Sequence, residues 1–223
     1  MNLADALDPI PDGAGPIGLL SGDEFTPPVA AFDRALLDLT GSRVALLLCA
    51  DHQAAHRSAR IAIEHFATLE ATTATLDLQD HGGRVTGRLP DYDVLYIGGG
   101  DPRQLLACMR GSKVWDEIVQ RWRAGAALVG SSAGAMALAT ECLVAREGDD
   151  RPTVWTEGLG PLEGVGLAVH VTTRPESWRR HVVEISRLPV LAIDDATGVL
   201  LSSGNAPVVI GPGAAWVERA GRA

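Results

Sequence analysis

The stretch that decides the fold is Ala126-Ala-Leu-Val-Gly-Ser-Ser-Ala-Gly-Ala-Met-Ala-Leu138, an apolar run that breaks at small residues and resumes as an alanine-rich helical pattern. When a buried strand turns sharply into a helix, the turn residue has a strained backbone and an exposed side chain, and only small residues fit two positions to either side. Gly130 and Gly134 occupy those positions around Ser132, whereas Ser131 stands one place too early. The pattern predicts a nucleophile elbow, with the amide of Ala133 at the start of the helix facing a developing oxyanion.

Apolar runs alternate with amphipathic segments on both sides of this elbow. The patterns predict strands at about 15–20, 43–49, 73–78, 93–97 and 165–171, and helices at about 29–39, 53–69, 103–109, 114–124 and 176–188. Continuous apolar strands between helices are typical of a parallel sheet that is covered on both faces. We therefore expect an α/β fold with a doubly wound, mostly parallel sheet, a long loop over 145–163, and a C-terminal antiparallel β meander over 190–218.

The length and charge of the chain limit the classes of protein to which it can belong. Its 223 residues fit a single α/β hydrolytic domain, 1–223, in which residues 1–14 are expected to be flexible. A formal net charge of −9 argues against nucleic acid and anionic membranes as partners. The N-terminus lacks the pattern of a signal peptide, and the three cysteines lie in apolar stretches, as buried thiols do. We expect a cytoplasmic protein that needs no metal or other cofactor.

A serine nucleophile needs a base, and the chain offers six histidines for that role. Only His170 ends a predicted strand downstream of the elbow, so it is the favoured base. His52 and His56 are spaced like a pair of metal ligands, but no third ligand is evident.

The acid and the second oxyanion donor come from two loops. Glu147, Asp149 and Asp150 all lie between Ser132 and His170, which gives the order serine, acid, histidine, and Asp150 is favoured among them. A backbone amide of the loop Gly98-Gly-Gly100 is the natural second donor, because this loop and the elbow both follow strands of one parallel sheet. The loop lacks the glycine spacing of a dinucleotide site and the lysine of a P-loop.

Together these residues resemble peptidase family S51, which includes aspartyl dipeptidase (peptidase E) and cyanophycinase and has a fold similar to that of class I glutamine amidotransferases. The resemblance runs through most of the chain. Its segments are Gly22-Asp-Glu-Phe25, Tyr96–Leu106, Gly130–Ala135, Gly158–Gly164 leading to His170, and Ile193-Asp-Asp195.

The resemblance implies a role for several residues. Ser132 would be the nucleophile and His170 the base, and the acid two residues before Pro152 would be Asp150. Arg174 would supply a cation for an acidic substrate side chain, with Arg179 and Arg180 as alternatives. The oxyanion donors would be Gly99 and Ala133, and the substrate-binding residues Gly100, Asp101, Gln104 and Arg174.

The function that the resemblance implies is that of a serine peptidase hydrolysing a short acidic (aspartyl) peptide or a related amide through a Ser-His-acid triad, with a homodimer as the common assembly. Val171 stands where the family usually has an aromatic residue, and Pro102 follows Gly-Gly-Asp where cyanophycinase has glutamine. These departures leave the substrate open. Two alternatives stay open as well: a catalytically inactive, amidotransferase-like protein that binds a small molecule, and a small esterase.

Overall fold

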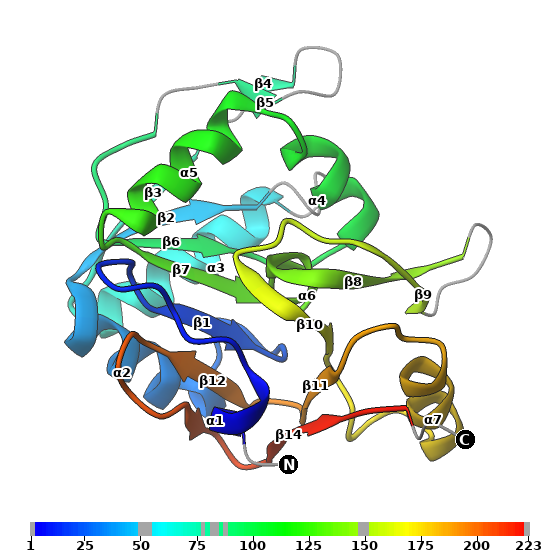
Figure 1. Cartoon of the computed structure of the whole chain (residues 1–223). Helices are drawn as coiled ribbons and strands as arrows, with labels where there is room; N and C mark the ends of the chain where they lie inside the picture. The colour runs from blue at the N-terminus through cyan, green and yellow to red at the C-terminus, as the bar shows by residue number, and fades with distance from the viewer. Residues whose placement is uncertain are drawn as a thin grey trace.

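The structure, a computed structural model, describes residues 3–48, 55–76, 79–80, 85–86, 89–146 and 152–220 (Figure 1). Its main sheet has seven strands in the order β13-β12-β1-β7-β6-β2-β3. Five of them are parallel: β1 (Ile17–Leu20), β7 (Ala127–Ser131), β6 (Val94–Ile97), β2 (Arg43–Leu47) and β3 (Thr72–Thr75). Two antiparallel strands, β12 (Gly198–Leu201) and β13 (Val208–Ile210), extend the sheet beyond β1. The expected α/β architecture with a mostly parallel sheet is confirmed.

Helices cover both faces of this sheet. One face carries α2 (Ala30–Thr40) and α3 (Ala55–Thr68), and the other carries α4 (Pro102–Met109), α5 (Lys113–Arg123) and the short α6 (Ala133–Leu138) (Figure 1). Successive residues of a strand point to opposite faces, so Leu19 packs with the second group of helices and Leu20 with the first. Burial on both sides explains why these strands are continuously apolar.

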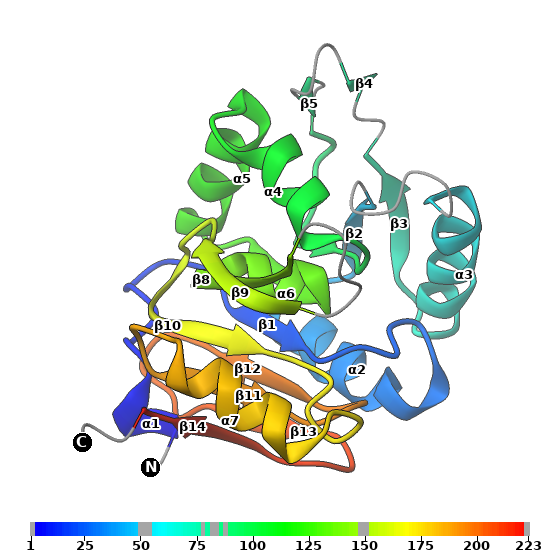
Figure 2. The same ribbon diagram turned by 90° about the vertical axis from the view of Figure 1, so that its right-hand side faces the viewer.

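A second sheet of five strands lies beside the first, in the order β14-β11-β10-β8-β9. Its strands are β8 (Ala139–Ala145), β9 (Pro152–Glu157), β10 (Leu162–Ala168), β11 (Val190–Ile193) and β14 (Ala215–Glu218). The helix α7 (Glu176–Glu184) connects β10 to β11 and packs on this sheet, where Trp155 Nε1 donates a 2.8 Å hydrogen bond to the carbonyl of Val182 (Figure 2). The remaining short elements are α1 (Leu3–Ala6), the 3-10 turn η1 (Pro27–Val29), and the paired β4 (Gln79–Asp80) and β5 (Val85–Thr86).

Two segments differ from the sequence prediction. The expected loop over 145–163 contains β9, which pairs antiparallel with β8 and places Trp155 opposite Leu143. The β-prone run 153–156 decides this pairing despite the Gly, Asp and Pro around it. The C-terminal strands also do not form one meander: β12 and β13 join the main sheet, while β14 pairs with β11 in the second.

The N-terminal residues are packed over the part that the structure describes. Residues 1–14 were expected to be flexible, but Leu3, Leu7 and Ile10 are all buried in the larger core cluster. Apolar residues at this spacing attach the segment to the body of the protein. Among the described helices, none combines the length and apolar character that crossing a membrane requires.

Candidate active site

The turn between β7 and α6 is a nucleophile elbow. Ser132 has φ 51° and ψ −112°, a sparsely populated conformation for a residue with a side chain. A β-carbon at Gly130 would lie 2.4 Å from the carbonyl carbon of Gly134, and one at Gly134 would lie 2.3 Å from the carbonyl oxygen of Ile97. Both positions therefore require glycine, as the sequence pattern predicted.

The base predicted from the sequence lies within hydrogen-bond distance of this serine. His170 follows β10, and its Nε2 is 3.0 Å from Ser132 Oγ. The backbone of His170 is left-handed, with φ 58°, and is fixed by Ser21. The buried Ser21 hydroxyl accepts a 2.8 Å hydrogen bond from the His170 amide and donates one of 3.1 Å to the carbonyl of Ile193. Ser21 thus connects the histidine to both β1 and β11.

The carboxylate on the other side of the imidazole belongs to Asp195. Its Oδ1 is 3.0 Å from His170 Nδ1, and its Oδ2 accepts a 3.1 Å hydrogen bond from the amide of Thr173. Asp150, the acid expected from the sequence, lies outside the described residues. Asp195 belongs to the motif Ile193-Asp-Asp195, which by itself indicates no catalytic role. The missed signal is topological: β10 and β11 are parallel neighbours, so the residues that follow them meet at one edge of the second sheet.

The glycine loop lies directly beside the nucleophile. It follows β6, which pairs in parallel with β7, so the loop and the elbow share the carboxyl edge of the sheet. A β-carbon at Gly99 would lie 3.2 Å from Ser132 Cβ. The amide of Ala133 is the first of α6, where backbone N–H groups have no partner within the helix. The two predicted oxyanion donors, Gly99 and Ala133, therefore flank Ser132.

A carboxylate that the sequence analysis did not single out contacts this site. Glu24 Oε1 accepts a 3.1 Å hydrogen bond from the amide of Gly99, and Glu24 Oε2 accepts one of 2.8 Å from the hydroxyl of Ser131. The loop that carries Glu24 is contorted, with φ 57° at Asp23 and 63° at Phe25. Its signal in the sequence is the motif Gly22-Asp-Glu-Phe25, which by itself indicates no function.

The other predicted substrate-binding residues have varied surroundings. Gly100 is exposed with φ 133°, and Gln104 lies partly buried on α4. The Asp101 side chain caps α4 by accepting a 2.8 Å hydrogen bond from the Arg103 amide. The guanidinium of Arg174 lies 5.6 Å from the centre of the Trp178 ring. In the described part of the chain, no hydrogen bond or ion pair joins the side chain of Asp101 or Arg174 to Ser132.

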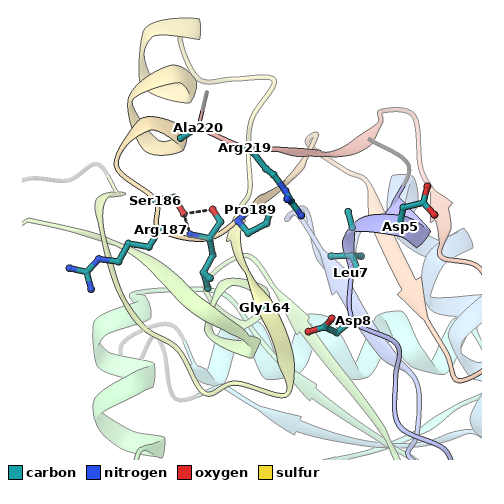
Figure 3. Close-up of a pocket in the computed structure, with 11 residues that line it drawn as sticks. Asp5, Leu7, Asp8, Gly164, Ser186, Arg187, Pro189, Arg219 and Ala220 are labelled. Carbon is teal, nitrogen blue, oxygen red and sulfur yellow. Dashed lines mark hydrogen bonds between the residues drawn. The ribbon is translucent and has the colours of Figure 1, made fainter. Parts of the chain in front are cut away.

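A hollow of about 760 Å³ lies elsewhere on the molecule (Figure 3). Charged residues at its wall include Asp5, Asp8, Arg187 and Arg219, and none of the Ser132 site residues lines it. Among the described residues, no group of three histidine, cysteine, aspartate or glutamate side chains is arranged to hold a metal ion. The hollow is therefore separate from the Ser132 site.

The chain is similar to known proteins over most of its length. The family model of peptidase family S51 matches residues 21–209. Peptidase E of Salmonella paratyphi A and that of Salmonella typhi are each 29% identical over 141 residues, which span 58% of this chain and 60% of each relative. The chain is thus matched to somewhat under two thirds of the length of these relatives.

Two solved structures share the fold. A peptidase from an acI-B1 Actinobacterium superposes with a TM-score of 0.71 at 21% identity, covering 94% of this chain and 96% of that one. A putative peptidase E protein from Listeria monocytogenes EGD-e gives a TM-score of 0.66 at 15% identity, covering 89% and 99%. At these identities the two structures show the fold alone. The family match, which extends over most of the chain, shows that this protein belongs to peptidase family S51.

Proposed function

We propose that the protein is a serine peptidase in which Ser132 is the nucleophile, His170 the general base and Asp195 the carboxylate that orients it. The observation that carries the proposal is the continuous chain from Ser132 Oγ to His170 Nε2 and from His170 Nδ1 to Asp195, with both distances at 3.0 Å. Membership of family S51 supports the same reaction class. Asp195 takes the role for which the sequence favoured Asp150.

The geometry suits acyl transfer through a covalent intermediate. When Nδ1–H donates to Asp195, Nε2 is left as an acceptor for the Ser132 hydroxyl proton. Ser132 Oγ then attacks the peptide carbonyl, and the amides of Gly99 and Ala133 stabilise the oxyanion. Collapse of the tetrahedral intermediate breaks the C–N bond as His170 returns the proton to the leaving amine. Water activated by His170 hydrolyses the acyl-enzyme and restores Ser132.

The substrate class that we propose is a short peptide with aspartate on the acyl side of the cleaved bond. Arg174 follows the residue whose amide binds Asp195, so its backbone lies close to the proposed catalytic groups. Its guanidinium lies over Trp178, and the buried Nε has no hydrogen-bond partner among the described residues. A planar cation with donors to spare is suited to bind a carboxylate in two-pronged fashion.

The test compares the wild-type protein with Ser132→Ala on a panel of Asp-Xaa dipeptides, isoaspartyl dipeptides and a simple ester. We expect serine-dependent release of the leaving amino acid from an aspartyl dipeptide, and labelling of Ser132 by a fluorophosphonate. Arg174→Lys is the matched variant for the substrate, since it keeps the charge but loses the planar guanidinium. Hydrolysis of the ester alone would contradict the peptidase assignment, and labelling that persists in Ser132→Ala would remove Ser132 from the mechanism.

A further inference from the structure

The amide of Gly99 is already occupied by an acceptor from the protein itself. Glu24 Oε1 accepts from this amide at 3.1 Å, and Oε2 is held by the Ser131 hydroxyl at 2.8 Å. A β-carbon at Gly99 would lie 2.9 Å from Glu24 Oε1 and 3.7 Å from Ser132 Oγ, so the carboxylate and the nucleophile lie on the same side of this glycine. Glu24 therefore covers the place where the oxyanion of an attacked carbonyl would bind.

A carboxylate in this place opposes the reaction unless something neutralises it. The oxyanion that forms on Ser132 attack needs the same N–H donor, and two negative charges at short range repel strongly in a partly buried site. No arginine, lysine or histidine in the described part of the chain forms an ion pair with Glu24. A substrate that carries a cation would supply the missing positive charge.

The geometry points to Glu24 as a specificity-determining residue. Its carboxylate moves away from the Gly99 amide and binds the free α-ammonium group of the substrate. This inference rests on the peptidase function proposed above. In the N-terminal residue of a peptide, the α-ammonium is attached to the carbon next to the scissile carbonyl. When that carbonyl oxygen takes the Gly99 amide, the ammonium lies close to the displaced carboxylate. A substrate with a free N-terminus thus uncovers the oxyanion donor. With an internal or N-blocked residue, the substrate carbonyl competes with Glu24 for the Gly99 amide, and no ammonium group is present to bind the displaced carboxylate.

The backbone of the loop that carries Glu24 is held in place and directs the Glu24 side chain toward the site. Asp23 and Phe25, on either side of it, both have left-handed backbones, a conformation that costs free energy in residues with side chains. Phe25 is buried against Phe66 and Tyr96, with ring centroids 5.9 and 5.1 Å away, and this packing anchors the loop. The backbone is therefore fixed, and the change that we infer is confined to the Glu24 side chain.

The experiment measures kcat/KM for aspartyl p-nitroanilide with its amine free and with its amine acetylated. We expect the wild-type protein to prefer the free amine, and Glu24→Gln to reduce the free-to-acetylated ratio by about 10- to 100-fold, the range of one charge-assisted hydrogen bond. Asp23→Asn is the matched control, because it removes an exposed negative charge from the neighbouring position and asparagine tolerates the left-handed backbone. We expect it to leave the ratio unchanged.

The outcomes separate this inference from the proposed function. An unchanged ratio in Glu24→Gln, with both compounds still cleaved, would overturn the role of Glu24 and leave the peptidase intact. If the wild type cleaves neither compound but a neutral fluorophosphonate labels Ser132, the substrate class is wrong. The labelling rate then decides the role of Glu24. If the Glu24 carboxylate covers the oxyanion donor, Glu24→Gln should be labelled faster than the wild type. An equal rate in the two proteins would overturn it.

Two further results complete the test. Should Glu24→Gln fail to fold, Glu24→Asp takes its place, because a carboxylate one methylene shorter does not reach the Gly99 amide and the ratio should fall in the same way. A ratio that stays at the wild-type value in Glu24→Asp would overturn the inference. Absence of labelling in both the wild type and the variant would remove the serine chemistry, and with it any function for Glu24 in substrate selection.

Discussion

The imidazole of His170 lies directly against the backbone of Gly22, so that a β-carbon at position 22 would lie 2.2 Å from His170 Cε1. The glycine comes from the loop after β1 and the histidine from the loop after β10, and the two therefore bring the two sheets together at the proposed active site. The α-carbon of Gly22 packs against one side of the His170 imidazole and so fixes the position of the ring relative to Ser132.

Gly22→Ala should displace this ring. We expect kcat to fall by about 100-fold, since a shift of about 1 Å in a catalytic group is enough for such a loss. Gly160→Ala is the control, because Gly160 has φ 83° but nothing within 4 Å of its β-carbon position. Both variants introduce strain at a glycine, so only a loss confined to Gly22→Ala identifies the contact with His170. Equal activity in the two variants would contradict this reading.

Asp195→Asn should separate the two candidate acids. The amide can present its NH2 group to Nδ1 and favour the unproductive tautomer of His170, so we expect kcat to drop by about 10³- to 10⁴-fold. Asp150→Asn should keep activity near that of the wild type. Asp194→Asn is a control for the loop itself, because its carboxylate accepts hydrogen bonds from Thr172 and Ala214 and contacts neither His170 nor Ser132 in the described structure. A large loss in Asp150→Asn with an active Asp195→Asn would reverse the assignment.

The local parts of the site could be predicted from the sequence. The elbow at Ser132 depends on residues that are neighbours in the chain, and the sizes of Gly130 and Gly134 are enough to identify it. His170 could be chosen because it ends an apolar run, which is again a local property. The structure has the predicted turn at Ser132 and places His170 beside it, because strand, turn and small-residue requirements act within a few positions.

The parts that depend on sheet order could not be predicted in this way. Asp195 reaches His170 because β11 pairs with β10 in a second sheet, which the pattern of apolar runs does not distinguish from a continuation of the first. Glu24 reaches Gly99 across a separation of 75 residues because β1 and β6 both flank β7. The choice of partner is a tertiary property, so the sequence pattern alone did not identify Asp195 or Glu24 as members of the site.

Ser21→Ala should lower both the free energy of unfolding and kcat. Loss of the hydroxyl leaves the His170 amide and the Ile193 carbonyl without their partner, so we expect a loss of about 1–3 kcal/mol in the free energy of unfolding. We also expect kcat to fall roughly 10-fold with little change in KM, because the backbone of the base is released.

Thr140→Val is the matched control for Ser21→Ala. The Thr140 hydroxyl likewise bridges two backbone groups, donating to Leu162 at 3.3 Å and accepting from Gly164 at 3.0 Å, but it lies in the second sheet away from His170. This variant should lose stability and keep its kcat. If both variants lower kcat in proportion to their stability, Ser21 has no positioning role.

The ion pair between Arg43 and Asp93 should make stability depend on pH in the acid range. Asp93 Oδ2 accepts hydrogen bonds from the Arg43 amide at 3.0 Å and from its Nε at 3.1 Å, and these bonds from Arg43 hold the pKa of the Asp93 carboxyl below its usual value. The unfolded chain therefore binds more protons between the lowered pKa and the usual value of about 4, so the stabilisation is complete above about pH 4 and is lost as the pH falls through the lowered pKa. Asp93→Asn should lower the urea midpoint at neutral pH and make that midpoint depend less on pH in the acid range.

Asp91, whose side chain is 81% exposed, also contacts Arg43, and solvent screening predicts a smaller effect for Asp91→Asn. Parallel pH curves for the wild type and Asp93→Asn would show that the pair does not contribute to acid stability.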